Sequence, residues 1–332
     1  DRPLREVLES GQPDFPFCIC WANQSWTRSW YGDESEVLIA SEYSREQDLR
    51  HFHDLLPYLR DPRYITVDRK PLLSIYRVDE LPNPAETAEL WRREAVKAGL
   101  PGLYLCHVMA NGSIDPDPER YGTDAAIARN TSWRGIPWRV ASAGRIFPRL
   151  GSRPDPYALH NVHRYQEMVA AGIYEWSPSH RVFPCVAPGW DNTPRRRFGA
   201  TIYMDSSPDL YRVWLRHALH QSCERFSGQE RLVFVNGWNE WAEGAHLEPD
   251  ARWGHAYLQA TRDVIADHIH LTMPRDGGPV QSAVPTELSQ IGKAYVQATA
   301  AQVAALHGKS ETAGEHLVAA IALYPPIAQH VS

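Results

Sequence analysis

The chain has 332 residues, which corresponds to one large domain or two smaller ones. Apolar residues make up 43% and charged residues 22%, a globular composition that excludes a fully disordered chain, a collagen-like repeat and a coiled coil. The net charge of −6 does not favour a nucleic-acid-binding surface, and no apolar run is long enough to span a membrane.

Short apolar runs along the chain predict β-strands, and most of them show no alternation of polar and apolar residues. This pattern is typical of parallel strands that are buried on both faces. In chain order, the predicted strands are Phe15–Trp21, Pro71–Tyr76, Leu103–Val108, Asp124–Ala128, Val182–Ala187 and Leu232–Val235.

Amphipathic segments lie between these runs and predict helices. The segment Ser44–Arg60 opens with a serine cap, and Pro84–Gly99 has proline at its start and glycine at its end, as helices often do. The predicted helices in chain order are Leu4–Ser10, Ser44–Arg60, Pro84–Gly99, Asp155–Gly172, Ser207–Phe226 and Trp253–His268.

The repeated strand–helix order predicts an α/β fold with a parallel sheet. A doubly wound nucleotide-binding fold would carry a glycine-rich turn after its first strand, and the turn at 22–26 contains no glycine. Nearly every predicted strand ends in polar or aromatic residues, which favours a (β/α)8 TIM-type barrel with its functional groups at the strand ends. Because only six strands are visible, we expect the barrel to lack its first one or two βα units.

The chain divides by composition into three parts. Residues 1–272 form the predicted barrel domain, and residues 273–287 are a linker rich in proline and glycine. Residues 288–332 are alanine-rich and predict a helical hairpin tail that is similar to one tetratricopeptide-type helix pair. Such a tail would offer a surface to a protein partner.

Cysteine and tryptophan usage give two further expectations. The five cysteines are dispersed and odd in number, and no signal peptide is visible, so we expect buried free thiols and a cytoplasmic location. The first residue is not methionine, which indicates a fragment or a processed product. The 12 tryptophans and 15 tyrosines suit either a sugar-binding cleft or a tryptophan-rich core.

The densest polar cluster, residues 236–249, directly follows the last predicted strand. It holds two carboxylates, Glu240 and Glu243, with tryptophan at 238 and 241. Hydrolysis of a glycosidic bond needs one carboxyl group that carries a proton and one that stays charged. Desolvation by nearby rings and repulsion between two carboxylates both raise a pKa. The alternative is a solvated loop with two surface glutamates.

The segment 239–244 (Asn-Glu-Trp-Ala-Glu-Gly), followed by 246–249 (His-Leu-Glu-Pro), resembles the signature of the glycoside hydrolase family 99-like proteins, which include the WbsX-type glycosyltransferases of polysaccharide loci. Three further segments, which are similar to that family and occur in its order, are 20–28, 61–73 and 187–195. The resemblance covers about residues 1–260 and implies a (β/α)8 barrel. It also implies a substrate drawn from a bacterial polysaccharide or its precursor.

The resemblance further implies roles for the two glutamates. Glu240 would be the base that helps the sugar 2-hydroxyl attack its own anomeric carbon, which gives a 1,2-anhydro sugar. Glu243 would protonate the leaving oxygen and then activate water. One departure from the family pattern concerns Gln24, because relatives commonly carry glutamate there, and its loss puts full activity in question.

Polar and aromatic residues near the predicted strand ends are the remaining candidates for substrate contacts, because tryptophan stacks on sugar rings and polar groups bond hydroxyls. These candidates are Trp21, Asn23, Trp26, Tyr76, His107, Trp190, Asp191, Asn192, Trp238, Asn239, Trp241, His246 and Glu248. Structural roles in turns and in the core are the alternatives. No metal site and no cofactor are predicted, since the residues around His246 lack a spaced ligand pair.

Two other functions compete with a glycosidase. A nucleotide-sugar glycosyltransferase would use an Asp-x-Asp metal motif, and Asp115 and Asp117 match its letters in a proline-rich turn. An inactive carbohydrate-binding domain is the third candidate. In each case we expect an oligosaccharide or polysaccharide as partner, and neither nucleic acid nor a membrane span.

Overall fold

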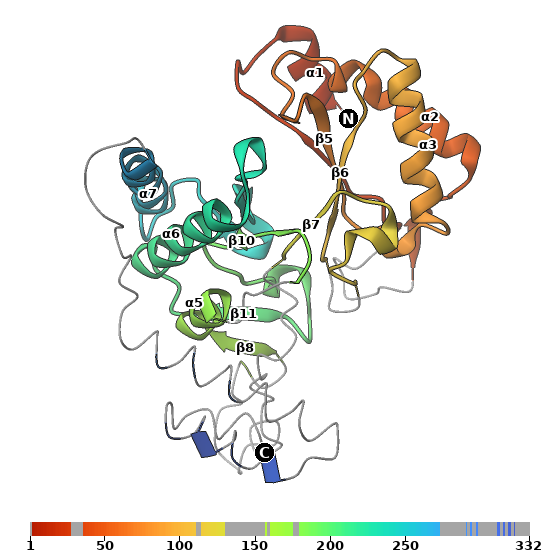
Figure 1. Ribbon diagram of the computed structural model, residues 1–332. Helices are drawn as coiled ribbons and strands as arrows, with labels where there is room; N and C mark the ends of the chain where they lie inside the picture. The colour runs from red at the N-terminus through yellow and green to blue at the C-terminus, as the bar shows by residue number, and fades with distance from the viewer. Residues whose placement is uncertain are drawn as a thin grey trace.

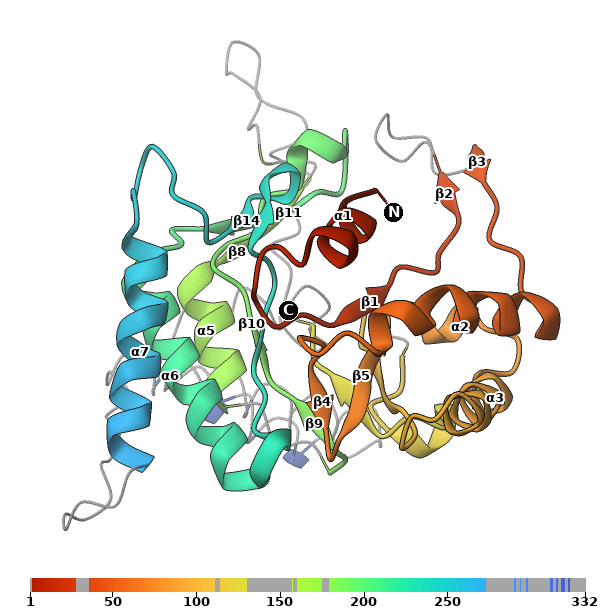
Figure 2. The ribbon, with the colours of Figure 1, turned by 90° about the horizontal axis from the view of Figure 1, so that it is seen from above.

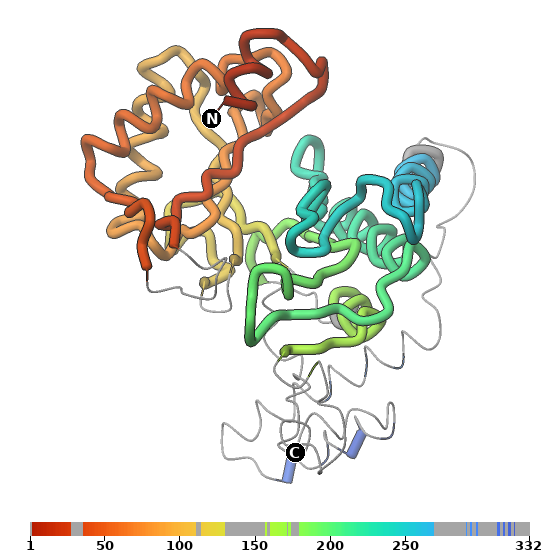
Figure 3. Tube along the Cα trace, turned by 180° about the vertical axis from the view of Figure 1, so that it is seen from behind, coloured from red at the N-terminus to blue at the C-terminus, as the bar shows by residue number. Residues whose placement is uncertain are grey.

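The computed structural model describes residues 2–27, 36–110, 114–129, 157, 160–174 and 179–272, with single positions between 290 and 322. The predicted linker and most of the predicted tail lie outside the described residues, so the division of the chain stays a prediction. Figure 1 shows two halves, the first in red to yellow and the second in green to blue. Figure 3 shows from behind that these halves lie beside each other.

A six-stranded sheet runs through the first half, in the order β1-β5-β6-β7-β9 with β4 as a hairpin partner of β5. All neighbours along that order are parallel, which confirms the predicted α/β arrangement. Strands β5 and β6 are almost wholly buried, which explains their continuous apolar sequences. The strands are β1 (Ile19–Trp21), β4 (Thr66–Val67), β5 (Lys70–Ile75), β6 (Tyr104–Val108), β7 (Ala125–Ile127) and β9 (Val182–Phe183).

The other described strands form two-stranded sheets. The parallel pairs are β10 (Cys185–Val186) with β12 (Phe234–Val235) and β8 (Asn161–Arg164) with β11 (Thr201–Met204). The antiparallel pairs are β2 (Trp26–Thr27) with β3 (Val37–Ile39) and β13 (Asn239–Glu240) with β14 (Ala245–His246). Pro184 separates β9 from β10, because proline has no N–H to continue a ladder.

The main sheet keeps its strands in chain order, as a (β/α)8 barrel does, but it does not close on itself among the described residues. Strand β8 lies between β7 and β9 in sequence and pairs instead with β11. The described strands therefore form an open sheet and separate pairs, and the closed eight-stranded barrel stays a prediction.

The helices match the predicted ones closely except at one place. Ser44 and Ser207 cap α2 and α6, since each hydroxyl accepts a main-chain N–H from the first turn. The helix predicted from residue 155 begins only at Tyr165, because the four preceding residues form β8 against β11. The helices are α1 (Arg2–Ser10), α2 (Arg45–Leu59), α3 (Pro84–Lys97), α5 (Tyr165–Tyr174), α6 (Pro208–Arg225) and α7 (Ala256–Thr272).

Helices cover each half and enclose separate hydrophobic clusters. Figure 2 shows α2 and α3 together on one side and α5, α6 and α7 on the other. Trp91 is fully buried in the first cluster and Trp214 is buried in the second. In α5, a Cβ on Gly172 would lie 2.4 Å from the indole of Trp214, so this glycine makes room for the ring.

Tryptophans occur both in the core and on the surface, since Trp91 and Trp214 are core residues and Trp26, Trp238 and Trp241 are exposed. The sugar-binding use of the exposed ones stays a prediction. All five cysteines are free thiols, but only Cys106 and Cys185 are buried, so the prediction that all are buried is wrong. Among the described ranges, no helix has the length and apolar character needed to cross a bilayer.

Candidate active site

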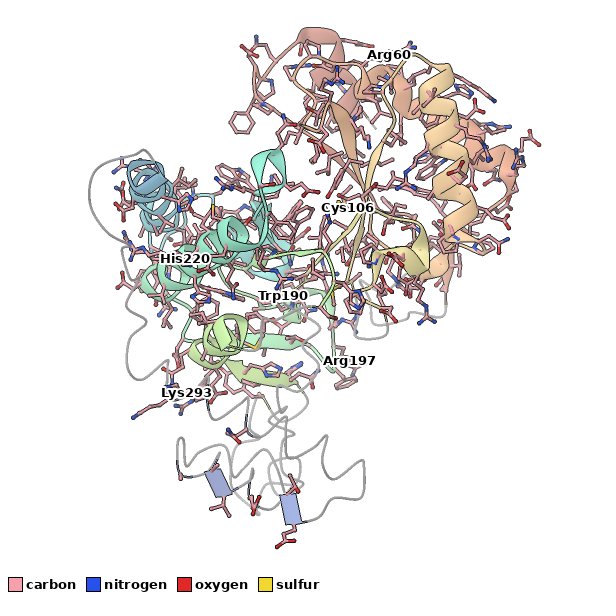
Figure 4. All side chains as sticks on the ribbon, viewed as in Figure 1. Arg60, Cys106, Trp190, Arg197, His220 and Lys293 are labelled. Carbon is pink, nitrogen blue, oxygen red and sulfur yellow. The ribbon has the colours of Figure 1, made fainter. Side chains whose placement is uncertain are left out.

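A cavity of about 740 Å³ opens where the two halves meet, at the carboxyl ends of the parallel strands. Its walls come from the segments that follow β1, β5, β6, β7 and β10, and from the segment that begins at β13. Trp190, labelled in Figure 4, lies at this junction. The lining residues are Ala22, Gln24, Ser25, Trp26, Thr27, Tyr76, Ala110, Arg129, Trp190, Asn192, Arg195, Arg196, Gly199, Thr201, Glu240 and Glu243.

One guanidinium holds both glutamates of the cavity. Arg195 ends the short 3-10 helix η4 (Thr193–Arg195), which follows the Trp-Asp-Asn turn after β10. Its Nη2 donates to Oε1 of Glu240 over 2.7 Å, and its Nη1 donates to Oε1 of Glu243 over 2.9 Å. The two carboxylates therefore face a common cation at the cavity wall.

The local backbone explains why these groups meet. Glu243 ends the 3-10 helix η6 (Trp241–Glu243), and Gly244 then adopts a left-handed conformation with φ of 61°. A Cβ at Gly244 would lie 2.9 Å from the main-chain nitrogen of Asp191, so only glycine allows the two loops to approach so closely. The Asp191 N–H donates to the Glu243 carbonyl oxygen over 2.8 Å, which fixes η6 against the loop that carries Arg195.

The two carboxylates have different surroundings. The side chain of Glu243 is 17% exposed and that of Glu240 is 43% exposed. Burial raises the pKa of Glu243, and its desolvation outweighs the lowering effects of Arg195 and Arg129. Glu243 therefore keeps its proton to a higher pH than an ordinary glutamate does.

A second arginine, Arg129, lines the same cavity as the glutamates. Arg129 follows β7, and its guanidinium carbon lies 5.0 Å from the ring centroid of Tyr76 and 5.6 Å from that of Trp190. Desolvation by burial lowers the pKa of Arg129, and the charge of Glu243 acts in the opposite direction. Cation–π contacts with two rings hold this charge in a poorly hydrated position.

The structure brings some of the predicted site residues together and leaves others apart. The predicted residues that line the cavity are Trp26, Tyr76, Trp190, Asn192, Glu240 and Glu243. Asn192 also accepts a main-chain N–H from Thr201 over 2.8 Å, so its amide oxygen has a structural partner. Trp26 is 65% exposed on β2, which leaves its ring accessible at the rim.

Three predicted residues near β1 and β6 have structural roles outside the cavity. Trp21 stacks on His51 with ring centroids 4.3 Å apart. Asn23 is 2% exposed, and its amide bonds the main-chain N–H and carbonyl of Arg77. His107 is fully buried, and its two ring nitrogens bond the Thr123 hydroxyl at 2.9 Å and a main-chain carbonyl at 3.0 Å.

The other predicted residues lie around the glutamate loop without lining the cavity. Asp191 accepts a main-chain N–H in its own turn, and Trp238 and Asn239 are exposed. Trp241 stacks on His246 at 3.9 Å with an interplanar angle of 15°. The indole N–H of Trp241 donates to Glu248 over 2.6 Å, so this exposed ring is fixed on one face and at one edge.

The aspartates of the possible metal motif take part in a turn. Asp115 accepts the main-chain N–H of Asp117 and pairs with Arg120 at 3.0 Å. Asp117 caps the 3-10 helix η3 (Pro118–Tyr121), and neither aspartate lines the cavity with the glutamates. No cluster of three or more metal-binding side chains occurs in the part of the chain that the structure describes.

Sequence reasoning missed all three cavity arginines, Arg129, Arg195 and Arg196, as site residues. Arg195 belongs to a segment that resembles the family, and Arg129 directly follows a predicted strand. The position of each in the sequence could therefore have marked it as a candidate site residue. Neither position shows which arginine faces a carboxylate, because that depends on how distant loops pack. Gln24 lines the cavity as well, at the position where relatives commonly carry glutamate.

Comparisons with known proteins match most of the chain, including the segments that form the cavity. The model of the family described as Glycosyltransferase WbsX matches residues 1–261. Two proteins called "Uncharacterized protein WxcX", from two strains of Xanthomonas campestris pv. campestris, are each 37% identical over 265 residues. That match covers 80% of this chain and 37% of each relative, so the chain spans little more than a third of the relatives' length.

Two solved structures show a distant likeness. One is a "Glycoside hydrolase-like protein" with 17% sequence identity and a TM-score of 0.48, covering 78% of this chain and 74% of its own. The other is the GH99 endo-alpha-mannosidase from Bacteroides thetaiotaomicron, with 15% identity and a TM-score of 0.44, covering 76% of this chain and 74% of its own.

Proposed function

Because the chain belongs to the WbsX glycosyltransferase family, we propose that its cavity is the active site of a carbohydrate-active enzyme in which Glu240 and Glu243 act on a glycosidic bond. The observation that carries this proposal is the shared contact of both carboxylates with Arg195 inside a polar cavity. The substrate is an oligosaccharide or polysaccharide of bacterial origin, or its precursor.

The difference in burial supports an assignment of roles. Glu243 is the general acid, because burial raises its pKa and favours the protonated form that an acid needs. Glu240 is the base, because its greater exposure keeps the charged carboxylate hydrated. Arg195 contacts both groups and thus helps to hold them in register for one bond.

The proposed reaction has two steps and retains the anomeric configuration. First, Glu240 takes the proton of the sugar 2-hydroxyl, O2 forms a bond to C1, and the C1–O bond to the leaving group breaks as Glu243 donates its proton to that oxygen. Second, Glu243 takes a proton from water, whose oxygen bonds to C1 as the C1–O2 bond breaks. O2 then recovers a proton from Glu240, so both glutamates return to their starting states.

Aromatic and amide groups of the cavity are the proposed contacts for the sugar. The rings of Trp26 and Tyr76 line the cavity and offer apolar faces that suit the C–H faces of a pyranose, whereas Trp190 is 4% exposed and supports the wall. The side-chain amide of Asn192 offers N–H groups to hydroxyls, while its oxygen stays bonded to Thr201.

The test uses the full-length protein with a panel of bacterial oligosaccharides, with and without a nucleotide-sugar donor and Mn²⁺, and with products analysed by mass spectrometry. Release of a shorter sugar without donor supports the proposal. Glu240→Gln and Glu243→Gln should each reduce turnover about 100-fold or more while sugar binding is nearly unchanged. Product growth that requires a donor, or full activity of both variants, would refute it.

A further inference from the structure

We propose that the cavity selects a sugar that carries an anionic group, a carboxylate or a phosphate, and that Arg129 and Arg196 bind this group. The inference rests on the proposed function, because it assumes that the cavity holds a carbohydrate. It adds the chemical class of substrate that the two glutamates alone do not define.

The first support is the charge of the cavity wall. The charged residues that line it in the described ranges are three arginines and two glutamates, so the arginines exceed the carboxylates by one. The whole chain carries a net charge of −6, so this local excess of positive charge runs against the overall balance. A neutral sugar gains little from such a wall, whereas an anion is attracted to it.

The second support is the way in which the charges are distributed. A single residue, Arg195, contacts both Glu240 and Glu243, at 2.7 and 2.9 Å. Arg129 and Arg196 reach the same cavity from different segments, one after β7 and one after η4. The remaining polar lining near them is neutral, as at Asn192 and Thr201, so a bound anion meets no further carboxylate in the described wall.

The third support is the environment of Arg129. Its guanidinium lies over the rings of both Tyr76 and Trp190, and these contacts orient it before any ligand arrives. Poorly hydrated charges attract a counter-ion more strongly than fully hydrated ones, because less water has to be displaced and the local dielectric is lower. A guanidinium also presents a planar set of donors that suits both carboxylate and phosphate oxygens.

The experiment measures binding rather than turnover, by calorimetry at low salt on the full-length protein. The probes are D-glucuronate, D-glucose 1-phosphate and D-glucose, so that carboxylate, phosphate and neutral forms of one sugar are compared. We expect one or both acidic probes to bind about tenfold or more tightly than glucose, with the advantage lost as salt rises. A stronger response to glucuronate assigns an acidic sugar, and a stronger response to the phosphate assigns a phosphorylated donor or precursor.

Two variants and a matched control keep the test decisive. Arg196→Gln should weaken the acidic probes about tenfold and leave glucose unchanged. Its neighbour Arg197, labelled in Figure 4, is not among the lining residues. Its guanidinium carbon lies 5.2 Å from the ring centroid of Phe198, so Arg197→Gln should bind like the wild type. Arg129→Lys keeps the charge but not the planar set of guanidinium donors. It should weaken the binding of the acidic probes less than Arg129→Met does.

The outcomes separate this inference from the proposed function. Equal binding of charged and neutral probes, or equal effects at Arg196 and Arg197, would overturn the anion site even if the protein cleaves a neutral glycan. Conversely, tight arginine-dependent binding of acidic probes in a protein that neither cleaves nor extends any glycan would support the site and refute the proposed catalysis.

Discussion

The main-chain nitrogen of Asp191 and the carbonyl oxygen of Glu243 are joined by a hydrogen bond of 2.8 Å. This bond ties the loop after β10, which carries Arg195, to the segment formed by β13 and η6, which carries both glutamates. The geometry of the candidate site therefore depends on a main-chain contact between segments that lie about fifty residues apart.

Gly244→Ala tests that contact. The added Cβ would lie 2.9 Å from the Asp191 nitrogen, and the residue has a φ of 61°. We expect the free energy of unfolding to fall by about 2 kcal/mol and activity to fall with it. Gly228→Ala is the control, because Gly228 has a φ of 56° but nothing within 4 Å of its added Cβ. Urea unfolding of both variants with equal losses would show that the close approach to Asp191 is unimportant.

Arg195→Met should move the pH dependence of turnover. The arginine lowers the pKa of Glu243, so its removal raises that pKa further. A general acid works only while protonated, and activity therefore falls as the pH rises through its pKa. The alkaline limb of the kcat/KM profile should then move to higher pH. Arg195→Lys keeps the positive charge, so its profile should lie closer to that of the wild type. A limb that stays in place, or moves to lower pH, would contradict the role given to Glu243.

His107 makes stability dependent on pH. Burial lowers the pKa of His107 to about 4 from 6.5, so the folded protein keeps this ring neutral while the unfolded chain takes up a proton. Its contribution is full above about pH 6.5 and is lost as the pH falls to about 4. The loss amounts to about 3 kcal/mol at most.

His107→Gln should flatten that decline in urea unfolding at pH 7.5, 6 and 5. His53 is an exposed histidine on α2, and His53→Gln should retain the wild-type slope. The same slope in all three proteins would show that another group is responsible for loss of stability in acid.

Trp241→Ala tests whether the ring beside the glutamates binds the substrate outside the cavity. The ring is 48% exposed, and its contacts with His246 and Glu248 orient it in advance. We expect KM for longer oligosaccharides to rise about tenfold with little change in kcat. The stacking of a planar nucleic-acid base on an aromatic side chain contributes about 1–3 kcal/mol, and a sugar ring stacked on Trp241 should gain a free energy of that order. Phe15→Ala, which removes a 70% exposed ring of another segment, is the control. A fall in kcat alone would point to a structural role for Trp241.

Local patterns predicted most of the elements because their causes are local. The apolar runs of β5 and β6 and the serine cap of α2 follow from side chains a few residues apart. The strand at Asn161–Arg164 was missed because its partner, Thr201–Met204, lies far along the chain. The apolar residues of this segment have helical spacing in the sequence, but main-chain pairing with β11 makes the segment a strand.

The candidate site was likewise predictable only where its features depend on local sequence. Positions at strand ends correctly indicate which segments approach one another, and Tyr76 and Glu240 both line the cavity. They do not indicate the face to which a side chain points, because a shift by one residue in a strand reverses it. His107 therefore points to Thr123, and the Asn23 amide is used by the backbone at Arg77. Arg195 was missed because its two acidic partners come from another loop.

The cavity is assembled from six separate stretches, the first at Ala22 and the last at Glu243. During synthesis, the aromatic and amide groups of the first half leave the ribosome long before the carboxylates do. A growing chain can thus contain part of the proposed sugar-binding wall before it contains either proposed catalytic glutamate. We expect catalytic activity to appear late in synthesis, when the β13–η6 segment docks against the Asp191 backbone. Binding of a sugar could therefore precede catalytic activity during synthesis.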